Sequence, residues 1–222
     1  MLEGDYRLQY ETLHAAGMAA KNNNDHERAL DIFNEAEMLA YEHHDEQKRL
    51  DALQPAARAL WSLNRYEEAA TKLETAAGIA DKLELVDEQG IIISNLGRLA
   101  AVEIIHNVEA KHQIQALEER SLPKFKQAYK ILDGHPHYFY PFTNAEHGSI
   151  VAALVGDRKF AAALVIEGMS LALRRSPEPY DQTLPYTHSQ YSLAQLAIAA
   201  NLIPFGNRTP VLARYARQNL IR

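Results

Sequence analysis

The sequence predicts an all-α fold, a stack of helix hairpins, and three observations support this prediction. Ala and Leu, which favour helix, are abundant, whereas β-branched runs are nearly absent, the longest being the isoleucines at 91–93. Apolar residues recur at the spacing of one helix face. The same pattern then returns at a constant interval, opening at Leu13, at Leu53 and at Ile93. Repetition at this scale indicates an α-solenoid, in which each hairpin buries its apolar stripe against its neighbours.

The first predicted hairpin has two amphipathic helices separated by a short polar turn. The two apolar stripes are Leu13, Ala16, Gly17 and Ala20, and then Ala29, Ile32, Phe33 and Ala36. In the polar run at 22–25, Asn24 or Asp25 is suited to cap the second helix by accepting from its free N–H groups. Because neither helix can bury its stripe alone, we expect the two to pack antiparallel.

Further copies of this pattern follow along the chain. The second has the stripes Leu53, Ala56, Ala57 and Leu60, and Tyr66, Ala69, Leu73 and Ala76. The third begins with Ile93, Leu96, Gly97 and Ala100, on a helix expected over about 87–110. A charged stretch at 111–120 is expected to separate it from a new helix, capped by Ser121, with Pro123 in its first turn.

The C-terminal part is predicted to continue the same solenoid with more divergent hairpins. Residues 134–144 are the least helical segment, and the aromatic run within it (138–142) is interpreted as a packed bridge, or alternatively as a ligand lid. Two hairpins then follow, the last helix opening at Thr209-Pro210. We therefore expect hairpins 1–3 over residues 1–133 and two further hairpins over 134–222.

The helix pair Leu13-x2-Ala16-Gly17-x2-Ala20 and Ala29-x3-Phe33-x2-Ala36 resembles a tetratricopeptide repeat, as does the stretch from Leu53 to Ala76. The interval from one copy to the next, as from Leu13 to Leu53, is longer than the family's usual repeat, and Trp is missing at the first large position. The resemblance implies a right-handed superhelical stack of about five hairpins. It also implies a concave face, lined by the first helix of each pair, where extended peptides or partner helices bind.

Candidate binding residues are those expected to face away from the buried stripes on these first helices. They are His14, Lys21, Arg58, Trp61, Asn95 and Arg98. Arg58 and Arg98 hold the same place in successive repeats, so they favour an acidic partner through paired guanidinium bonds. The alternative is that both arginines pair within the protein, with Glu11, Asp51 or Glu103.

The composition narrows the classes of function. Residues 1–133 carry 15 Lys+Arg and 24 Asp+Glu, an acidic balance that argues against a general nucleic-acid binder. Residues 134–222 carry 8 Lys+Arg and 5 Asp+Glu. The basic last helix is interpreted as a solvated helix end, with RNA binding as the alternative. Cysteine is absent, which excludes disulfides and thiolate metal sites. We find neither a signal peptide nor a membrane span in the sequence, and expect a cytoplasmic location.

The sequence carries no catalytic or phosphate-binding motif, so we expect neither an enzyme nor a bound cofactor. Three histidines, His135, His137 and His147, flank the aromatic run. We interpret them as surface or turn residues, with transition-metal binding as a weaker alternative, because no carboxylate is placed beside them.

The leading functional hypothesis is a scaffold that binds a protein or peptide segment. A second hypothesis is self-assembly into a homodimer, through an apolar end formed by Leu202–Phe205 with Leu212 and Leu220.

Overall fold

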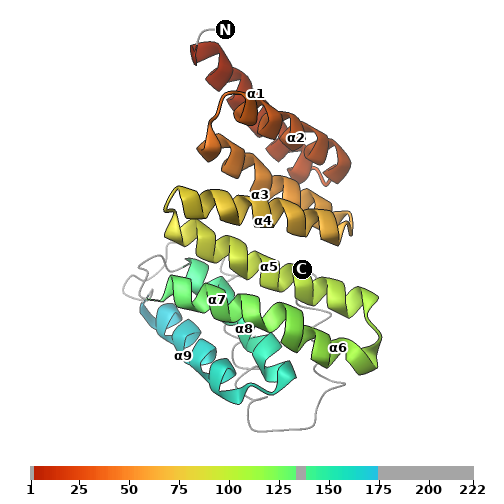
Figure 1. Cartoon of the computed structure of the whole chain (residues 1–222), viewed down its shortest axis with the longest axis vertical. Helices are drawn as coiled ribbons and strands as arrows, with labels where there is room; N and C mark the ends of the chain where they lie inside the picture. Colours follow the sequence, from red (N-terminus) through yellow and green to blue (C-terminus); the bar gives the residue numbers. More distant parts are fainter. Residues whose placement is uncertain (1–2, 134–138, 175–222) are drawn as a thin grey trace. The chain divides into compact units, whose positions relative to one another are not determined.

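The computed structural model describes residues 3–133 and 139–174, with side chains from 6 to 133 and from 144 to 168. These residues form helices joined by tight turns, without a strand (Figure 1), which confirms the all-α helical repeat fold. The chain divides into two compact units, Met1–Ile92 and Ile93–Arg222. The division at 133/134 stays a prediction, because the last expected hairpin lies outside the described residues.

The first unit consists of two helix hairpins and the start of a third. Its helices are α1 (Glu3–Asn22), α2 (His26–Glu42), α3 (Glu46–Ser62), α4 (Tyr66–Lys82) and the first turns of α5 (Val86–Asn107). From α1 to α4, each helix packs against the next along the chain. The predicted hairpins are thereby confirmed.

The turns of the first unit recur at a regular interval, half the interval at which the sequence pattern repeats. Asn24, His44, Asn64 and Glu84 each take a positive φ, between 55° and 60°. The next residue then donates its backbone N–H back to the preceding helix, as from Asp25 to the Ala20 carbonyl at 3.0 Å. This left-handed ending satisfies carbonyls that would otherwise lack a donor.

The residue that closes each turn also starts the next helix. The carboxylate of Asp25 accepts from the Arg28 N–H at 3.3 Å, and that of Asp45 accepts from the Lys48 N–H at 3.0 Å. Asp25 is therefore the cap predicted for the second helix, and Asn24 instead supplies the left-handed residue. At Arg65, the same turn is made without a side-chain cap.

Close packing between the two helices of a hairpin depends on a small residue facing a large one. A Cβ atom on Gly17 would lie 2.7 Å from the Phe33 ring, so only glycine fits there. In the next repeat, the equivalent positions hold Ala57 and Leu73, both buried. A smaller apolar side chain on the second helix thus accompanies a larger residue on the first.

The second unit contains the rest of α5, then α6 (Ala110–Ala116), η1 (Leu117–Ser121), α7 (Leu122–Leu132), α8 (Phe139–Val155) and α9 (Arg158–Arg174). Two predictions of secondary structure are wrong here. The charged stretch at 111–120 is helical rather than a break, since α6, a π turn and α7 follow one another in helical conformation. The segment 139–144 belongs to α8 rather than to a loop.

The π turn lies where a proline and a serine meet the preceding helix. Pro123 has no N–H and its ring crowds the carbonyl one turn earlier, which a wider turn tolerates better than an α-helix. Ser121 does not cap α7 as predicted; its hydroxyl donates to the Gly97 carbonyl at 2.8 Å and ties the turn to α5. The side chain of Gln113 likewise donates to the Ile105 carbonyl, so α6 is also held against α5.

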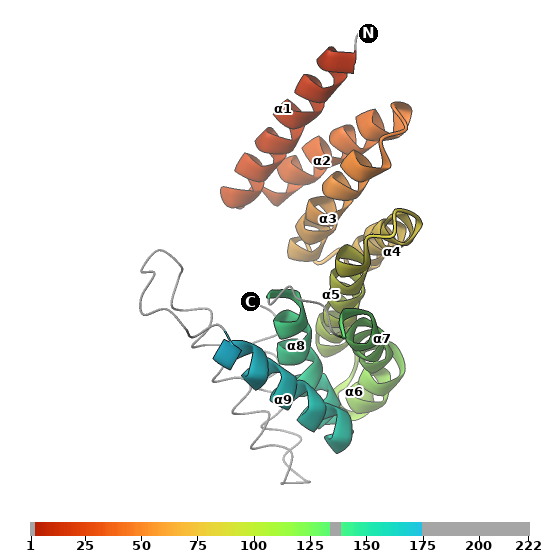
Figure 2. The same ribbon diagram turned by 90° about the vertical axis from the view of Figure 1, so that its left-hand side faces the viewer.

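The core of the second unit gathers around Phe125 of α7. Cβ atoms on Gly97 of α5 and on Gly148 of α8 would each lie 3.2 Å from this ring. Helices α8 and α9 pack against each other as a hairpin (Figure 2). Their turn contains Gly156, with a φ of 91°, and Asp157, which accepts from the Phe160 N–H at 3.1 Å. A left-handed residue followed by an aspartate cap is the same arrangement as in the first unit.

Candidate functional site

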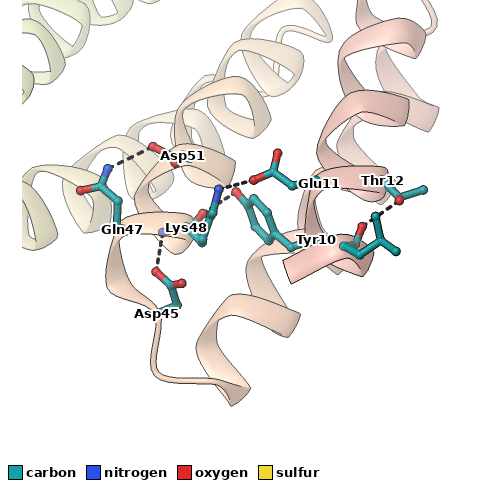
Figure 3. Close-up of polar contacts among 8 residues, drawn as sticks. Tyr10, Glu11, Thr12, Asp45, Gln47, Lys48 and Asp51 are labelled. Atoms are coloured by element: carbon teal, nitrogen blue, oxygen red, sulfur yellow. Dashed lines mark hydrogen bonds and ion pairs between the residues drawn. The ribbon is translucent and has the colours of Figure 1, made fainter. Parts of the chain in front are cut away.

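Helices α1 and α3, the first helices of the two hairpins, meet along a seam. In the first half of both helices, the Tyr10 hydroxyl donates to the Lys48 carbonyl at 2.6 Å, and the Lys48 ammonium pairs with Glu11 (Figure 3). The same ammonium lies 4.9 Å from the centre of the Tyr10 ring. These contacts fix the register of the two helices at this point, where Tyr10 and Glu11 of α1 meet Lys48, 38 and 37 positions later.

Burial at this seam changes the chemistry of its tyrosines. Burial, followed by the negative charge of Asp45, raises the pKa of Tyr6 to about 12. Burial also raises the pKa of Tyr10, with help from the charge of Asp51. Both hydroxyls are neutral near pH 7, as an exposed tyrosine also is, and that of Tyr10 acts here as a hydrogen-bond donor.

Towards the C-terminal ends of the same two helices, the positive charge of Arg58 on α3 acts on Lys21 of α1. Burial lowers the pKa of Lys21, and the positive charge of Arg58 lowers it further. Lys21 is half-buried, with its ammonium 3.5 Å from the Met18 sulfur, and Arg58 is exposed. The two like charges repel each other, which costs free energy unless an anion joins them.

No described carboxylate forms an ion pair with Lys21 or Arg58. The acidic residues named as alternative partners are engaged elsewhere: Glu11 pairs with Lys48, and Glu103 pairs with Arg120. Asp51 accepts from the Gln47 side chain at 3.2 Å. Residues 1–92 hold only 9 Lys+Arg against 19 Asp+Glu, so this pair is a local exception to an acidic unit.

Two other candidate residues of the first unit lie on the same two helices. His14 stacks on Tyr10, with ring centres 6.0 Å apart, and meets the Phe33 ring edge-on at 5.8 Å. These contacts hold the imidazole at the edge of the core. Trp61 is half-buried, one turn beyond Arg58 on α3.

The remaining two candidates, Asn95 and Arg98, lie on α5 in the second unit. Both are half-buried, and Arg98 already has an interaction of its own. Their role in binding stays a prediction.

Little in the sequence pointed to the Tyr10 and Lys48 contacts or to the closeness of Lys21 and Arg58. The repeat pairs residues such as Leu13 and Leu53, whereas neighbouring helices meet at an offset of 37 or 38 positions. Oppositely charged residues at that smaller offset, such as Glu11 and Lys48, are the signal that could have found the register.

The histidine candidates fall partly outside the described part of the chain, where His135 and His137 lie. His147 is buried in α8, with a contact of its own, so its interpretation as a surface or turn residue is wrong. Within residues 3–133 and 139–174, no group of three or more His, Asp or Glu side chains is arranged to hold a metal ion.

Comparison with known proteins identifies the fold. The chain is similar to the crystal structure of a putative kinesin light chain from Podosopora anserina with nearly identical TPR-like repeats, with a TM-score of 0.59 and 16% identity over 98% of this chain and 99% of that one. The chain has a tetratricopeptide-like repeat fold. No protein-family model matches this tetratricopeptide-like chain, and no curated protein matches it.

One further property concerns membranes. Among the described helices of this tetratricopeptide-like fold, none combines the length and the apolar character needed to cross a bilayer.

Proposed function

We propose that this chain is a scaffold that binds an acidic segment of another protein on the paired first helices, α1 and α3. The observation that supports this most directly is the pair of cations at Lys21 and Arg58, on adjoining first helices, where the charge of Arg58 lowers the pKa of Lys21 and neither has an ion-pair partner among the described residues. A guanidinium offers two parallel bonds to a carboxylate, and an ammonium adds a point charge.

The environment of the pair also suits a peptide ligand. Trp61 and Met18 supply apolar surface beside the two charges, since both are half-buried. An aromatic anchor next to a charge is typical of the few residues that carry most of the binding energy in an interface. The preferred segment would therefore combine Asp or Glu with an apolar residue close by.

The test uses peptide libraries in which one position is fixed in turn as Asp, Asn, Lys or Leu, incubated with the purified chain. We expect enrichment of Asp over its neutral isostere Asn, because the local charge is positive. Affinity of the selected peptide should fall at least about tenfold in Arg58→Glu and in Lys21→Glu, and also fall as salt rises.

Arg28→Glu provides the matched control, since it reverses an exposed charge on α2 of the same unit. This variant should bind as the wild type does. Equal loss in Arg28→Glu would mean that only net charge matters, and unchanged affinity in Arg58→Glu would remove the proposed site.

A further inference from the structure

Helix α3 has one open face, and a proline lies on it. The open face holds Asp51, Gln54, Pro55 and Arg58, which are half-buried or exposed. The residues between them are buried, and they are Ala52, Leu53, Ala56, Ala57, Ala59 and Leu60. Helix α3 packs against α2 before it and against α4 after it. The face is therefore open on a helix that has a described neighbour on either side along the chain.

Pro55 changes the hydrogen bonding of this open face. Proline is tolerated in the first turn of a helix, but Pro55 lies in the middle of α3. Because proline has no N–H, the carbonyl of Asp51, one turn earlier, loses the donor that a regular α-helix supplies. The open face thus carries a backbone oxygen that can accept a hydrogen bond from outside α3.

A neighbouring carbonyl of α3 already accepts such a bond. The Tyr10 hydroxyl of α1 donates to the Lys48 carbonyl at 2.6 Å (Figure 3). Lys48 lies one turn before Asp51 on the same side of α3, since residues three apart are neighbours on a helix surface. The backbone of α3 is therefore within reach of a donor from another segment along this side.

The charged side chains give the open face a direction. The Asp51 carboxylate accepts from the side chain of Gln47, one turn nearer the start of α3, at 3.2 Å. Arg58 is exposed and lies about two turns beyond Asp51, towards the end of the helix. An acidic ligand side chain is attracted to Arg58 and repelled by Asp51. The part of a ligand beside Asp51 should therefore be neutral or basic.

Pro55 also distinguishes α3 from the other first helices. At the repeat interval that leads from Leu13 to Leu53 and Ile93, the equivalent positions hold Ala15 in α1 and Asn95 in α5. Proline destabilises a helix interior more than any other residue does. Residues that break a local rule are expected mainly where function requires them. A ligand that uses the freed carbonyl would account for Pro55.

We propose that the freed carbonyl of Asp51 accepts a backbone N–H from the bound segment, while Arg58 binds an acidic side chain of the same segment. The proposal rests on the proposed function and adds to it the conformation of the ligand. Asp51 and Arg58 are about 10 Å apart along the helix axis, which an extended chain covers with about three residues. The ligand is therefore extended, with its acidic residue about three positions from the bonded N–H.

An ester scan of the peptide tests this bond. The probe is the Asp-containing peptide selected from the libraries, with one backbone amide at a time replaced by an ester. An ester removes the N–H and keeps the shape of the chain. We expect a single ester, about three positions from the Asp, to weaken binding to the wild type about three- to tenfold. If no single ester weakens binding, the proposal is wrong.

Pro55→Ala tests whether the acceptor is the Asp51 carbonyl. The alanine N–H would bond this carbonyl within α3, so the unmodified peptide should bind about three- to tenfold more weakly, and the sensitive ester should cost nothing further. Pro123→Ala, the same exchange at an exposed position of α7 in the second unit, should bind both peptides as the wild type does. An ester effect as large in Pro55→Ala as in the wild type would contradict the proposal.

Arg58→Glu separates this proposal from the proposed function. If Arg58→Glu loses affinity while no ester has an effect, an acidic segment binds without its backbone, and only the present proposal fails. If neither Arg58→Glu nor any ester changes the affinity, the proposed function fails with it. Libraries that select no Asp-containing peptide would likewise remove both.

Discussion

The two units build their hairpins from the same contacts but with different regularity. In the first unit, Gly17 meets Phe33 across one tight turn between two consecutive helices. In the second, Gly97 meets Phe125 across a much longer segment that contains α6 and a π turn. The contact of a glycine with a phenyl ring is thus kept while the intervening length changes. Size matching between facing helices, rather than strict spacing, sets how closely a hairpin packs.

Gly17→Ala should give the largest loss of stability, because its Cβ would lie 2.7 Å from a buried ring. We expect the free energy of unfolding to fall by about 1–3 kcal/mol. In Gly17→Ala/Phe33→Leu, which copies the Ala57 and Leu73 pair of the next repeat, much of this loss should be recovered. Urea unfolding followed by the fluorescence of Trp61, the single tryptophan, reports on this unit.

Gly78→Ala is the control for that prediction. Gly78 lies on α4, and a Cβ there would have no atom within 4 Å. The same exchange should stabilise the helix by about 0.5–1 kcal/mol. If Gly17→Ala also stabilises, or if the double variant is no better than the sum of its parts, size matching is not the determinant.

The second unit differs from the first in carrying a carboxyl that titrates near neutral pH. Burial, followed by the charge of Asp133, raises the pKa of Glu167 on α9 to about 7. A carboxyl whose pKa is raised by folding contributes stability at low pH and loses that contribution as pH rises through 7. Glu167→Gln should therefore stabilise the second unit by about 1–2 kcal/mol at pH 8, and change it little at pH 5.

Hydrogen exchange of amides in residues 144–168, read by mass spectrometry at both pH values, measures this effect. Glu118→Gln makes the same change at an exposed position of the same unit and should leave exchange unaltered. Slower exchange in Glu167→Gln at pH 5 as well as at pH 8 would show that the charge of Glu167 is not the cause.

The sequence was sufficient to predict the helix hairpins and insufficient to predict the contacts between neighbouring hairpins. Local rules of periodicity and capping predicted the apolar stripes that contain Leu53 and Phe33 and the helix cap at Asp25. The burial of both side chains and the hydrogen bond to Asp25 confirm these predictions. Contacts between neighbouring hairpins depend on how far one helix slides along the next, and the repeat period does not give that shift. The hydrogen bond of Tyr10 with Lys48 is such a contact.

The π turn was not predicted from the sequence, for a related reason. Charged residues at 111–120 suggested a break, but their helix is held by Gln113 and Ser121, whose side chains donate to carbonyls of α5. Such bonds depend on the position of another helix, so a local pattern cannot show them. Pro123 indicates that the helix is irregular at this point, but the sequence alone does not distinguish a break from a π turn.

The smallest predicted effect concerns the turns that make the first unit so regular. Glu84 holds a φ of 57°, a conformation that costs a residue with a Cβ about 1–2 kcal/mol, whereas Gly156 makes the same turn in the second unit freely. Glu84→Gly should raise the free energy of unfolding by only about 0.5–1 kcal/mol, since glycine loses more entropy on folding. Glu74→Gly, the same exchange at an exposed position inside α4, should instead lower it by about 0.7–1 kcal/mol. If Glu84→Gly raises the free energy of unfolding while Glu74→Gly lowers it, the left-handed turn at Glu84 holds backbone strain that the fold tolerates. Equal losses of stability in both variants would mean that Glu84 carries no strain to relieve.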